Sequence, residues 1–375
     1  KSYRDSLSGQ IQTELREKLK AYFGKRHAFL FYDGKTAIAV LLKSLLQNGS
    51  VLTPAYNCIA VPQAIQAAGF APRFVDARPG RLDADPRDFR NAIRSDTQLL
   101  MPVHLFGIPW WIDELCEMCS DHQLPIVEDA APALGARRNG LLVGSRGDAM
   151  VLSFHWTKPL SGETGGAVLT DDDEIADRIR GFSDQNMPAP GSRGVLFLKT
   201  WLRKSVCVPC VFGLARVGHR LLFGQRMFEV VANETGNGKT AFYGMPPFSC
   251  ALVLNQLDRL DAYCGQRRQA AGIYQRSLQN NPHFSLPVIP DGSEPSWTQY
   301  PVLVDQKLGF FLHMQRHGID VTWSYRYSCP DTFHMQGFEN SGRVAQQIVS
   351  LPTWPGLRPD EMRRIAEAAA EYSLN

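Results

Sequence analysis

The feature of this chain that most constrains its fold is a set of three short apolar runs within residues 125–170. The runs cover residues 125–127, 149–154 and 166–169, and polar residues do not alternate within them. Strands that are buried on both faces have this composition, so we expect three buried strands of a parallel sheet. Helices cover both faces of such a sheet, and the runs therefore predict an α/β fold.

Polar residues follow two of these runs, where the expected strands end. Glu128 and Asp129 follow the first run, and the second leads into the segment SFHWTK, which ends at Lys158. Open α/β sheets bind ligands at the carboxyl ends of their strands. Pyridoxal phosphate (PLP) needs an amine for a Schiff base and an anion beside its ring nitrogen, and Lys158 and Asp129 could fill these roles. For the pair alone, the alternative of two solvated side chains stays open.

Five segments together resemble the DegT/DnrJ/EryC1/StrS family, the sugar aminotransferases among the fold-type I PLP enzymes. They are TPAYNCIAVPQAIQAAGFAPRFVDA, MPVHLFGIP, VEDAAPALGA, SFHWTKPLSGETGG and LPTWPGL. The resemblance extends from about residue 29 to residue 357, with the motifs in the family order. It implies a fold-type I PLP-dependent transferase, with a mostly parallel central sheet, helices on both faces and a smaller C-terminal α+β domain.

The resemblance assigns roles to individual residues. The lysine of the family's SFH-x-x-K motif carries the cofactor and falls on Lys158, with His155 inside the motif. The ED-A-A aspartate falls on Asp129, and a serine that binds the cofactor phosphate falls on Ser153. The resemblance also places Trp323 and Tyr325, loosely, where substrate-facing aromatic residues occur.

A second phosphate-binding segment is expected at Gly34, Lys35 and Thr36, before a helix over residues 37–46. Glycine and threonine at a helix start suit an anion, because free N–H groups and the helix dipole point at it. The family has its phosphate loop here, usually as Ser-Gly-Thr-Ala. A Walker A loop would require glycine where Phe29 stands. An ordinary helix cap remains the other interpretation.

The chain departs from the family pattern at Cys58, Pro132, Phe242 and Gly244. The family has an aromatic residue that stacks on the cofactor ring at position 58, so Tyr56 or Asn57 is expected to compensate. Pro132 replaces a glutamine that contacts the ring hydroxyl. Phe242 and Gly244 replace residues that bring a phosphate contact from the partner subunit, which Lys239 or its loop could supply instead.

The expected organisation is an N-terminal helix over residues 1–23, a large PLP-binding domain over 24–255 and a small domain over 256–375. Further strands are expected at 27–32, 51–55, 73–76, 98–103, 299–304 and 319–323. Further helices are expected at 59–68, 86–94, 171–180, 249–278, 308–317 and 359–372, the helix at 86–94 with Asp85 as its N-cap.

Residues 185–245 form an atypical insert. Within it, residues 194–231 are apolar and basic, and Glu229 is their single acid. This segment could lie on an anionic membrane surface or bind a lipid- or carrier-linked substrate. It could equally be a helical hairpin that covers the active site or packs on a dimer mate.

The composition limits the class of protein. A net charge of +3 over 375 residues gives no argument for nucleic-acid binding. Eight cysteines without a framework spacing indicate reduced thiols, so Cys116/Cys119 and Cys207/Cys210 are interpreted as structural rather than zinc-binding. The first twenty residues contain no apolar signal stretch. We expect a cytoplasmic protein, with peripheral membrane contact through 194–231 as an option.

The predicted function is a PLP-dependent aminotransferase. It would move an amino group from an amino acid, with glutamate as the expected donor, to a keto-sugar linked to a nucleotide. The family implies a homodimer with active sites at the interface. Three alternatives stay open: another PLP reaction such as elimination, a lipid- or carrier-linked ketone as acceptor, and a non-catalytic binding protein. The presence of Lys158 disfavours the dehydratase branch of the family, which has histidine in its place.

Overall fold

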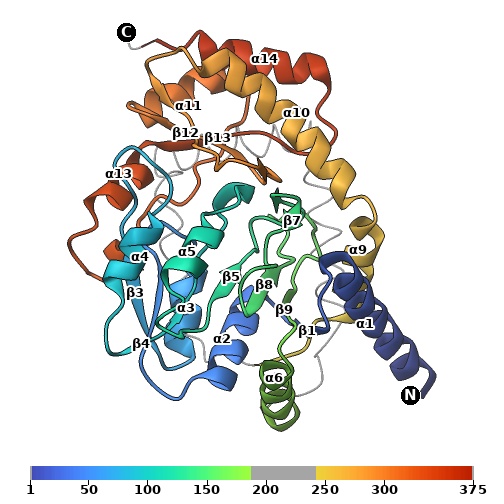
Figure 1. The fold of residues 1–375 in the computed structure, drawn as a ribbon. Helices are drawn as coiled ribbons and strands as arrows, with labels where there is room; N and C mark the ends of the chain where they lie inside the picture. Colours follow the sequence, from blue (N-terminus) through green and yellow to red (C-terminus); the bar gives the residue numbers. More distant parts are fainter. Residues whose placement is uncertain (1, 187–241, 374–375) are drawn as a thin grey trace, which may run out of the picture.

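The computed structural model describes residues 2–186 and 242–373, and its larger part is built on one central sheet (Figure 1). Hydrogen bonds form two ladders, β1-β9-β8-β5 and β3-β2-β4. Parallel bridges Leu100↔Ile126 and Val103↔Asp129 join them, so the strand order is β3-β2-β4-β5-β8-β9-β1. The strands are β1 His27–Phe31, β2 Ser50–Pro54, β3 Ala71–Val75, β4 Thr97–Leu100, β5 Val127–Asp129, β8 Ala149–Ser153 and β9 Gly166–Thr170.

The sheet is mostly parallel, with one reversed strand. β2 runs parallel to β3 and β4, and β5 runs parallel to β8. β9 is antiparallel to both of its neighbours, β8 and β1, and Ser153 pairs with Gly166. The prediction of three parallel strands is therefore wrong for β9. The connection over residues 154–165 contains no helix, and a parallel return requires a longer crossover.

Helices cover both faces of the sheet, because successive residues of a buried strand enter different cores. Met150 and Leu152 of β8 pack with α1 (Ser2–Phe23), α9 (Pro247–Leu257) and the start of α10 (Leu260–Leu278). Val151 packs on the opposite side, with α2 (Gly34–Leu45), α3 (Ala60–Ala67) and α6 (Asp173–Asn186). Near β2 and β4, α4 (Pro86–Ala92, N-capped by Asp85) and α5 (Ile112–Met118) enclose a further core.

The smaller part has its own core around a second sheet. Its antiparallel strands are β10 Phe284–Ser285, β12 Tyr300–Val304 and β13 Ile348–Leu351. The end of α10, α11 (Lys307–Arg316) and α14 (Pro359–Ala370) pack on these strands. Figure 1 shows α10 running from the side of the central sheet into the smaller part. The remaining elements are η1 Leu105–Gly107, β6 Arg137–Arg138, β7 Leu141–Leu142, β11 Ser293–Glu294, α12 Cys329–Thr332 and α13 Glu339–Gln347.

Two predicted elements in this half of the chain are wrong. The helix expected over 249–278 is two helices, α9 and α10, which break at Asp258 and Arg259 without a glycine or proline to mark the break. The strand expected over 319–323 is one isolated bridge, Thr322↔Ser350. Ile319 and Val321 are buried, so their alternation reflects burial and not a hydrogen-bonded ladder. The domain limits at 24–255 and 256–375 stay a prediction.

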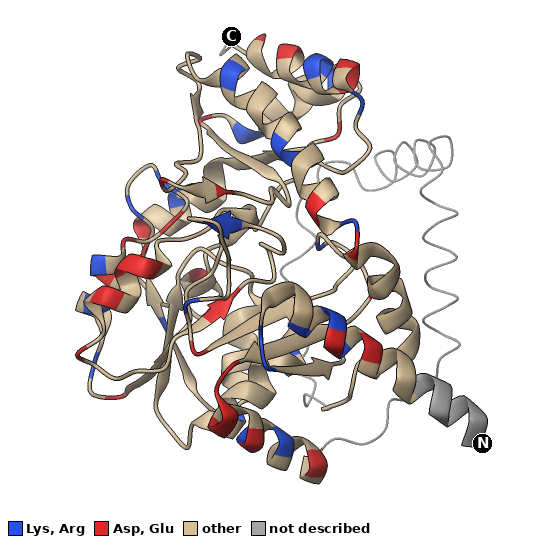
Figure 2. Cartoon of the chain, turned by 45° about the vertical axis from the view of Figure 1, so that its right-hand side comes forward, with Lys and Arg blue, Asp and Glu red and all other residues tan. Residues whose placement is uncertain are grey.

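Several predictions fall on residues 187–241, outside the described residues: the 194–231 segment, the Lys239 loop, Cys207 and Cys210. In the described part, no helix is both long and apolar enough to cross a bilayer. Figure 2 shows lysine and arginine interspersed with aspartate and glutamate over the described helices. At the end of α5, burial raises the pKa of the Cys116 thiol to about 11, which keeps it protonated at neutral pH.

Candidate active site

The fold brings Asp129 and Lys158 to the same edge of the central sheet. Asp129 is the last residue of β5, and Ser153 is the last residue of the parallel neighbour β8. Lys158 follows in a turn closed by a hydrogen bond from its own N–H to the His155 carbonyl, at 2.8 Å. Its side chain is partly exposed, whereas Asp129 is 4% exposed.

Asp129 is a buried carboxylate with little compensation for its lost hydration. Burial raises its pKa, while the nearby charge of Lys158, the Ala131 N–H and His104 oppose the rise. The Ala131 N–H donates to Oδ1 at 3.0 Å, and the hydrogen bonds of the described residues give this side chain no other donor. A carboxylate in this state gains from a cation placed against it. The ring nitrogen of PLP, once protonated, is such a cation, so the residue fits the proposed cofactor.

The start of α2 approaches Ser153 closely. A Cβ on Gly34 would lie 3.2 Å from Ser153 Cβ and 3.3 Å from its Oγ, so only glycine allows this approach without displacement. The Asp33 carboxylate caps the helix by accepting a hydrogen bond from the Thr36 N–H at 2.7 Å. Thr36 is buried and Lys35 is exposed. A phosphate here would meet a helix N-terminus and a serine hydroxyl, and Lys35 could offset the charge of Asp33.

The glycine pair after Lys158, Gly165 and Gly166, lies against the start of α2. Asp33 forms a parallel bridge with Gly165, and the Thr164 hydroxyl donates to the Tyr32 carbonyl at 2.6 Å. A Cβ on Gly166 would lie 2.4 Å from the Asp33 carbonyl oxygen. The turn into β9 therefore packs directly against the loop that begins α2.

The residues around position 58 do not all face the site. Tyr56 is 1% exposed, and its hydroxyl donates to the carbonyls of Ser324 and Tyr325, at 3.3 Å each. Asn57 is equally buried, with its amide held by Thr53 and by the Cys58 N–H. Cys58 is partly exposed. The side chains of Tyr56 and Asn57 are thus engaged in hydrogen bonds inside the protein, and their compensation for the missing aromatic stack stays a prediction.

His155 lies at the surface of the turn that carries Lys158. Its side chain is exposed, its Nδ1 is 3.0 Å from the Thr157 hydroxyl, and its ring lies 5.5 Å from that of Trp156. Trp156 is 50% exposed. The structure therefore brings His155 near the lysine but at the solvent side of the site.

A buried pair beside Asp129 could not be assigned a role from the sequence. Glu128 Oε1 accepts from the Arg146 and Gly147 N–H groups, and Oε2 accepts from the Gly144 N–H and from His104 Nε2 at 2.9 Å. The Trp110 N–H donates to His104 Nδ1 at 2.8 Å, so Nε2 carries the imidazole proton. Burial alone would raise the pKa of Glu128, but these hydrogen bonds hold it below its usual value. The two adjacent acids therefore differ: four hydrogen bonds hold the Glu128 carboxylate, whereas the described residues supply one to the Asp129 carboxylate.

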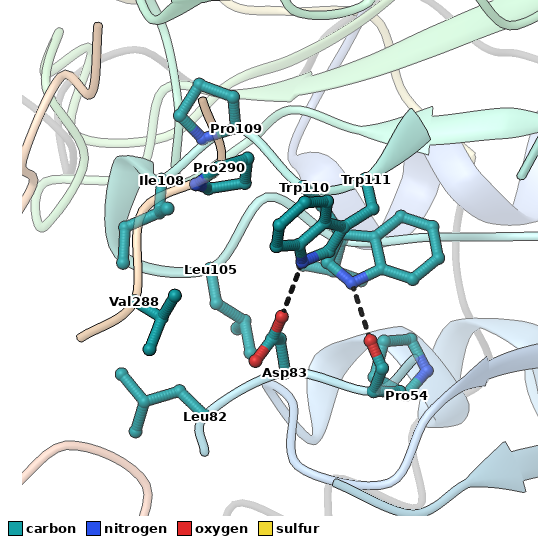
Figure 3. A pocket seen from close by; sticks show the side chains of 12 residues that line it. Pro54, Leu82, Asp83, Leu105, Ile108, Pro109, Trp110, Trp111, Val288 and Pro290 are labelled. Carbon is teal, nitrogen blue, oxygen red and sulfur yellow. Dashed lines mark hydrogen bonds between the residues drawn. The ribbon is translucent and has the colours of Figure 1, made fainter. Parts of the chain in front are cut away.

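A small apolar pocket lies near the site, between the strand ends and residues 288–290 (Figure 3). Trp110 Nε1 donates to the Ala84 carbonyl at 3.1 Å and Trp111 Nε1 donates to Asp83 Oδ2 at 2.8 Å. The cavity measures about 30 Å³, which is room for one or two water molecules. A sugar does not fit there.

The whole chain is similar to known aminotransferases. A family model described as the DegT/DnrJ/EryC1/StrS aminotransferase family matches residues 4–370. The dTDP-3-amino-3,4,6-trideoxy-alpha-D-glucose transaminase of Micromonospora megalomicea subsp. nigra is 29% identical over 382 residues, covering 97% of this chain and 90% of that protein.

Two solved structures share the fold. DesV of S. venezuelae, in complex with a ketimine intermediate, gives a TM-score of 0.76 at 24% identity, covering 99% of this chain and 95% of that one. A Bacillus subtilis protein, ntda, with bound cofactor PMP, gives a TM-score of 0.73 at 20% identity, covering 96% of this chain and 76% of that one.

Proposed function

Because the chain belongs to the DegT/DnrJ/EryC1/StrS aminotransferase family, we propose that it moves an amino group from glutamate to a keto-sugar. The resemblance seen in the sequence is confirmed, and the protein is a PLP-dependent aminotransferase. The name of the Micromonospora relative supports a nucleotide-linked sugar as the acceptor. One observation supports the assignment of the site: the buried Asp129 ends β5, its parallel neighbour β8 leads to Lys158, and Lys158 is near enough for its charge to lower the Asp129 pKa.

The residues of this chain would divide the work as follows. PLP, when bound, supplies an electron sink for the carbon that loses its proton. Asp129 would accept a hydrogen bond from the ring nitrogen and keep it protonated. Lys158 would hold the cofactor through its ε-amine and, once the donor has displaced it, take the proton from the donor Cα as a general base. Ser153 and the Gly34-Lys35-Thr36 turn would hold the phosphate.

Reconstitution with PLP tests this assignment. The wild-type protein is expected to turn yellow, and Lys158→Ala is expected to lose the visible absorption and to release PLP on dialysis. With glutamate and no acceptor, the wild type should form one 2-oxoglutarate per bound PLP, and Lys158→Ala should be slower by at least about 100-fold. The exposed Lys43 of α2 offers a matched control, and Lys43→Ala should match the wild type. Retention of the absorption by Lys158→Ala would contradict the assignment.

The same reaction separates the alternatives. An enzyme for elimination would take up PLP but form no 2-oxoglutarate from glutamate. A protein that binds no PLP would be a non-catalytic member of the fold. A nucleotide-linked keto-sugar and a lipid-linked ketone, offered to the glutamate-treated enzyme, would show which acceptor regenerates the yellow form. We also propose a homodimer with shared active sites, which light scattering of the purified protein tests.

A further inference from the structure

Residues 324–329 of the smaller part are hydrogen-bonded to residues 55–59, the loop that carries Cys58. The Cys329 N–H donates to the Ala55 carbonyl at 2.8 Å, and the Ile59 N–H donates to the Tyr327 hydroxyl at 3.3 Å. The Tyr56 hydroxyl donates to the carbonyls of Ser324 and Tyr325, and the Cys329 thiol donates to the Asn57 carbonyl at 3.3 Å. Residues 324–329 thus line the loop over its whole length.

Tyr325 is held in place at the centre of this segment. Its ring lies 5.9 Å from that of Tyr56 in an edge-to-face arrangement, 6.3 Å from Phe106 and 6.4 Å from Tyr327. Its φ is 20°, a backbone conformation that few residues other than glycine adopt. Such a conformation persists only where the surroundings fix it. The side chain is therefore preorganised, although it comes from a part of the chain far from the sheet.

The surroundings of Tyr325 include both groups that matter for a cofactor ring. Burial raises the pKa of its hydroxyl well above the usual value, and the neighbouring ionisable groups, Asp129 among them, add to the rise. Its ring also packs against that of Tyr56, two residues before Cys58, and that of Phe106, two residues after His104, whose N–H donates to the Asp129 carbonyl at 3.1 Å. Tyr325 therefore packs both on the loop with the stacking position and on the segment bonded to the residue assigned to the ring nitrogen. Cys58 is small and partly exposed, so it leaves room that an aromatic residue at position 58 would fill.

We propose that Tyr325 supplies the aromatic face that position 58 lacks, so that the PLP ring is covered from the smaller part of the molecule. The inference rests on the proposed function, because it requires PLP between Asp129 and Lys158. An aromatic ring against a cofactor ring stabilises binding by dispersion and quadrupole contacts, which depend on the face and not on the hydroxyl. Cofactor affinity would then depend on how residues 324–329 are docked on the Cys58 loop.

The test measures the dissociation constant of PLP in the apoprotein, from the visible absorption and from the quenching of tryptophan fluorescence. Tyr325→Ala is expected to weaken PLP binding about tenfold. Tyr325→Phe keeps the ring and is expected to bind PLP as the wild type does. Urea unfolding of each apoprotein shows whether the variant is folded.

A second substitution tests whether the two positions share one space. In the Tyr325→Ala background, Cys58→Phe should restore PLP affinity; in the wild-type background it should lower affinity through crowding. Unchanged affinity in Tyr325→Ala, an equal loss in Tyr325→Phe, or no rescue by Cys58→Phe in a folded protein would each overturn the inference. A wild-type protein that takes up no PLP would overturn the proposed function as well, so the two failures are distinguishable.

Discussion

His104 and Glu128 form an ion-dipole pair that solvent does not reach, with Nε2 and Oε2 2.9 Å apart and both side chains 0% exposed. The Trp110 N–H donates to Nδ1, so the Nε2 proton faces the carboxylate, which accepts from four N–H donors. The pair fixes the ends of β4 and β5, and the His104 N–H donates to the Asp129 carbonyl at 3.1 Å.

Glu128→Gln is expected to lower the free energy of unfolding by about 3 kcal/mol, because an amide NH₂ would face buried N–H donors. The pKa of Glu128 is lowered in the folded protein, so its contribution to stability is complete above the ordinary value of 4.5 and is lost as the pH falls below it. Urea unfolding between pH 7 and 3 measures both effects. Exposed Glu117→Gln is the control, and an equal loss there would contradict the anchoring role.

Asp129→Asn is expected to have opposite effects on stability and activity. The pKa of Asp129 is raised in the folded protein, so its contribution to stability is present below the ordinary value of 3.8 and is lost as the pH rises through the folded value. Asparagine removes this loss, and the apoprotein should unfold at higher urea at pH 7. Transamination should fall by about 100-fold or more, because the ring nitrogen loses its counter-ion. A less stable apoprotein would contradict the interpretation.

The acidic pair illustrates what the sequence could predict. The carboxyl ends of β5 and β8 follow from apolar runs, so the meeting of Asp129 and Lys158 at one edge was predictable. The role of Glu128 was not, because its donors come from residues 144–147 and from a histidine in another strand end. The burial of Tyr56 and Asn57 was not predictable for the same reason, because their contacts depend on tertiary structure: the Tyr56 hydroxyl donates to the carbonyl of Ser324, 268 positions away.

Gly34→Ala is expected to weaken PLP binding about tenfold with little change in fold stability. The added Cβ, 3.2 Å from Ser153 Cβ, pushes the helix start and the serine apart. PLP titration measures the effect. Gly181 in α6 has nothing within 4 Å, so Gly181→Ala should leave PLP affinity unchanged and stabilise the helix by about 0.5–1 kcal/mol. Equal PLP affinity in the two variants would remove Gly34 from the phosphate site.

Gly107→Ala is expected to destabilise the protein by at least about 3 kcal/mol. Gly107 has a φ of 86°, and a Cβ there would lie 2.6 Å from the Trp297 backbone nitrogen. Its carbonyl accepts from the Ser296 N–H at 2.9 Å, which joins the two parts of the molecule. Gly69 has a φ of 93° but open space, so Gly69→Ala should cost only about 1–2 kcal/mol of backbone strain. If urea unfolding shows similar losses of stability in Gly107→Ala and Gly69→Ala, backbone strain and not the close contact with Trp297 determines the effect at position 107.

The pattern of apolar runs reported burial but not strand direction, because direction depends on the connection between strands. Residues 154–165 provide too short a path for a helical crossover, and β9 turns back on β8. The same limit explains the isolated bridge at Thr322, where apolar alternation gave no information about a pairing partner.

The reversed strand decides how far the amine at residue 158 can travel. Ser153 and Gly166 lie opposite each other in the β8–β9 pair, so both ends of the segment 154–165, which carries this amine, are fixed at one position of the sheet. The range over which the ε-amine moves is then set by rotations about the side-chain bonds of Lys158. If β9 ran parallel to β8, the segment after Lys158 would have to cross to the opposite edge of the sheet, and its backbone would hold the amine less firmly.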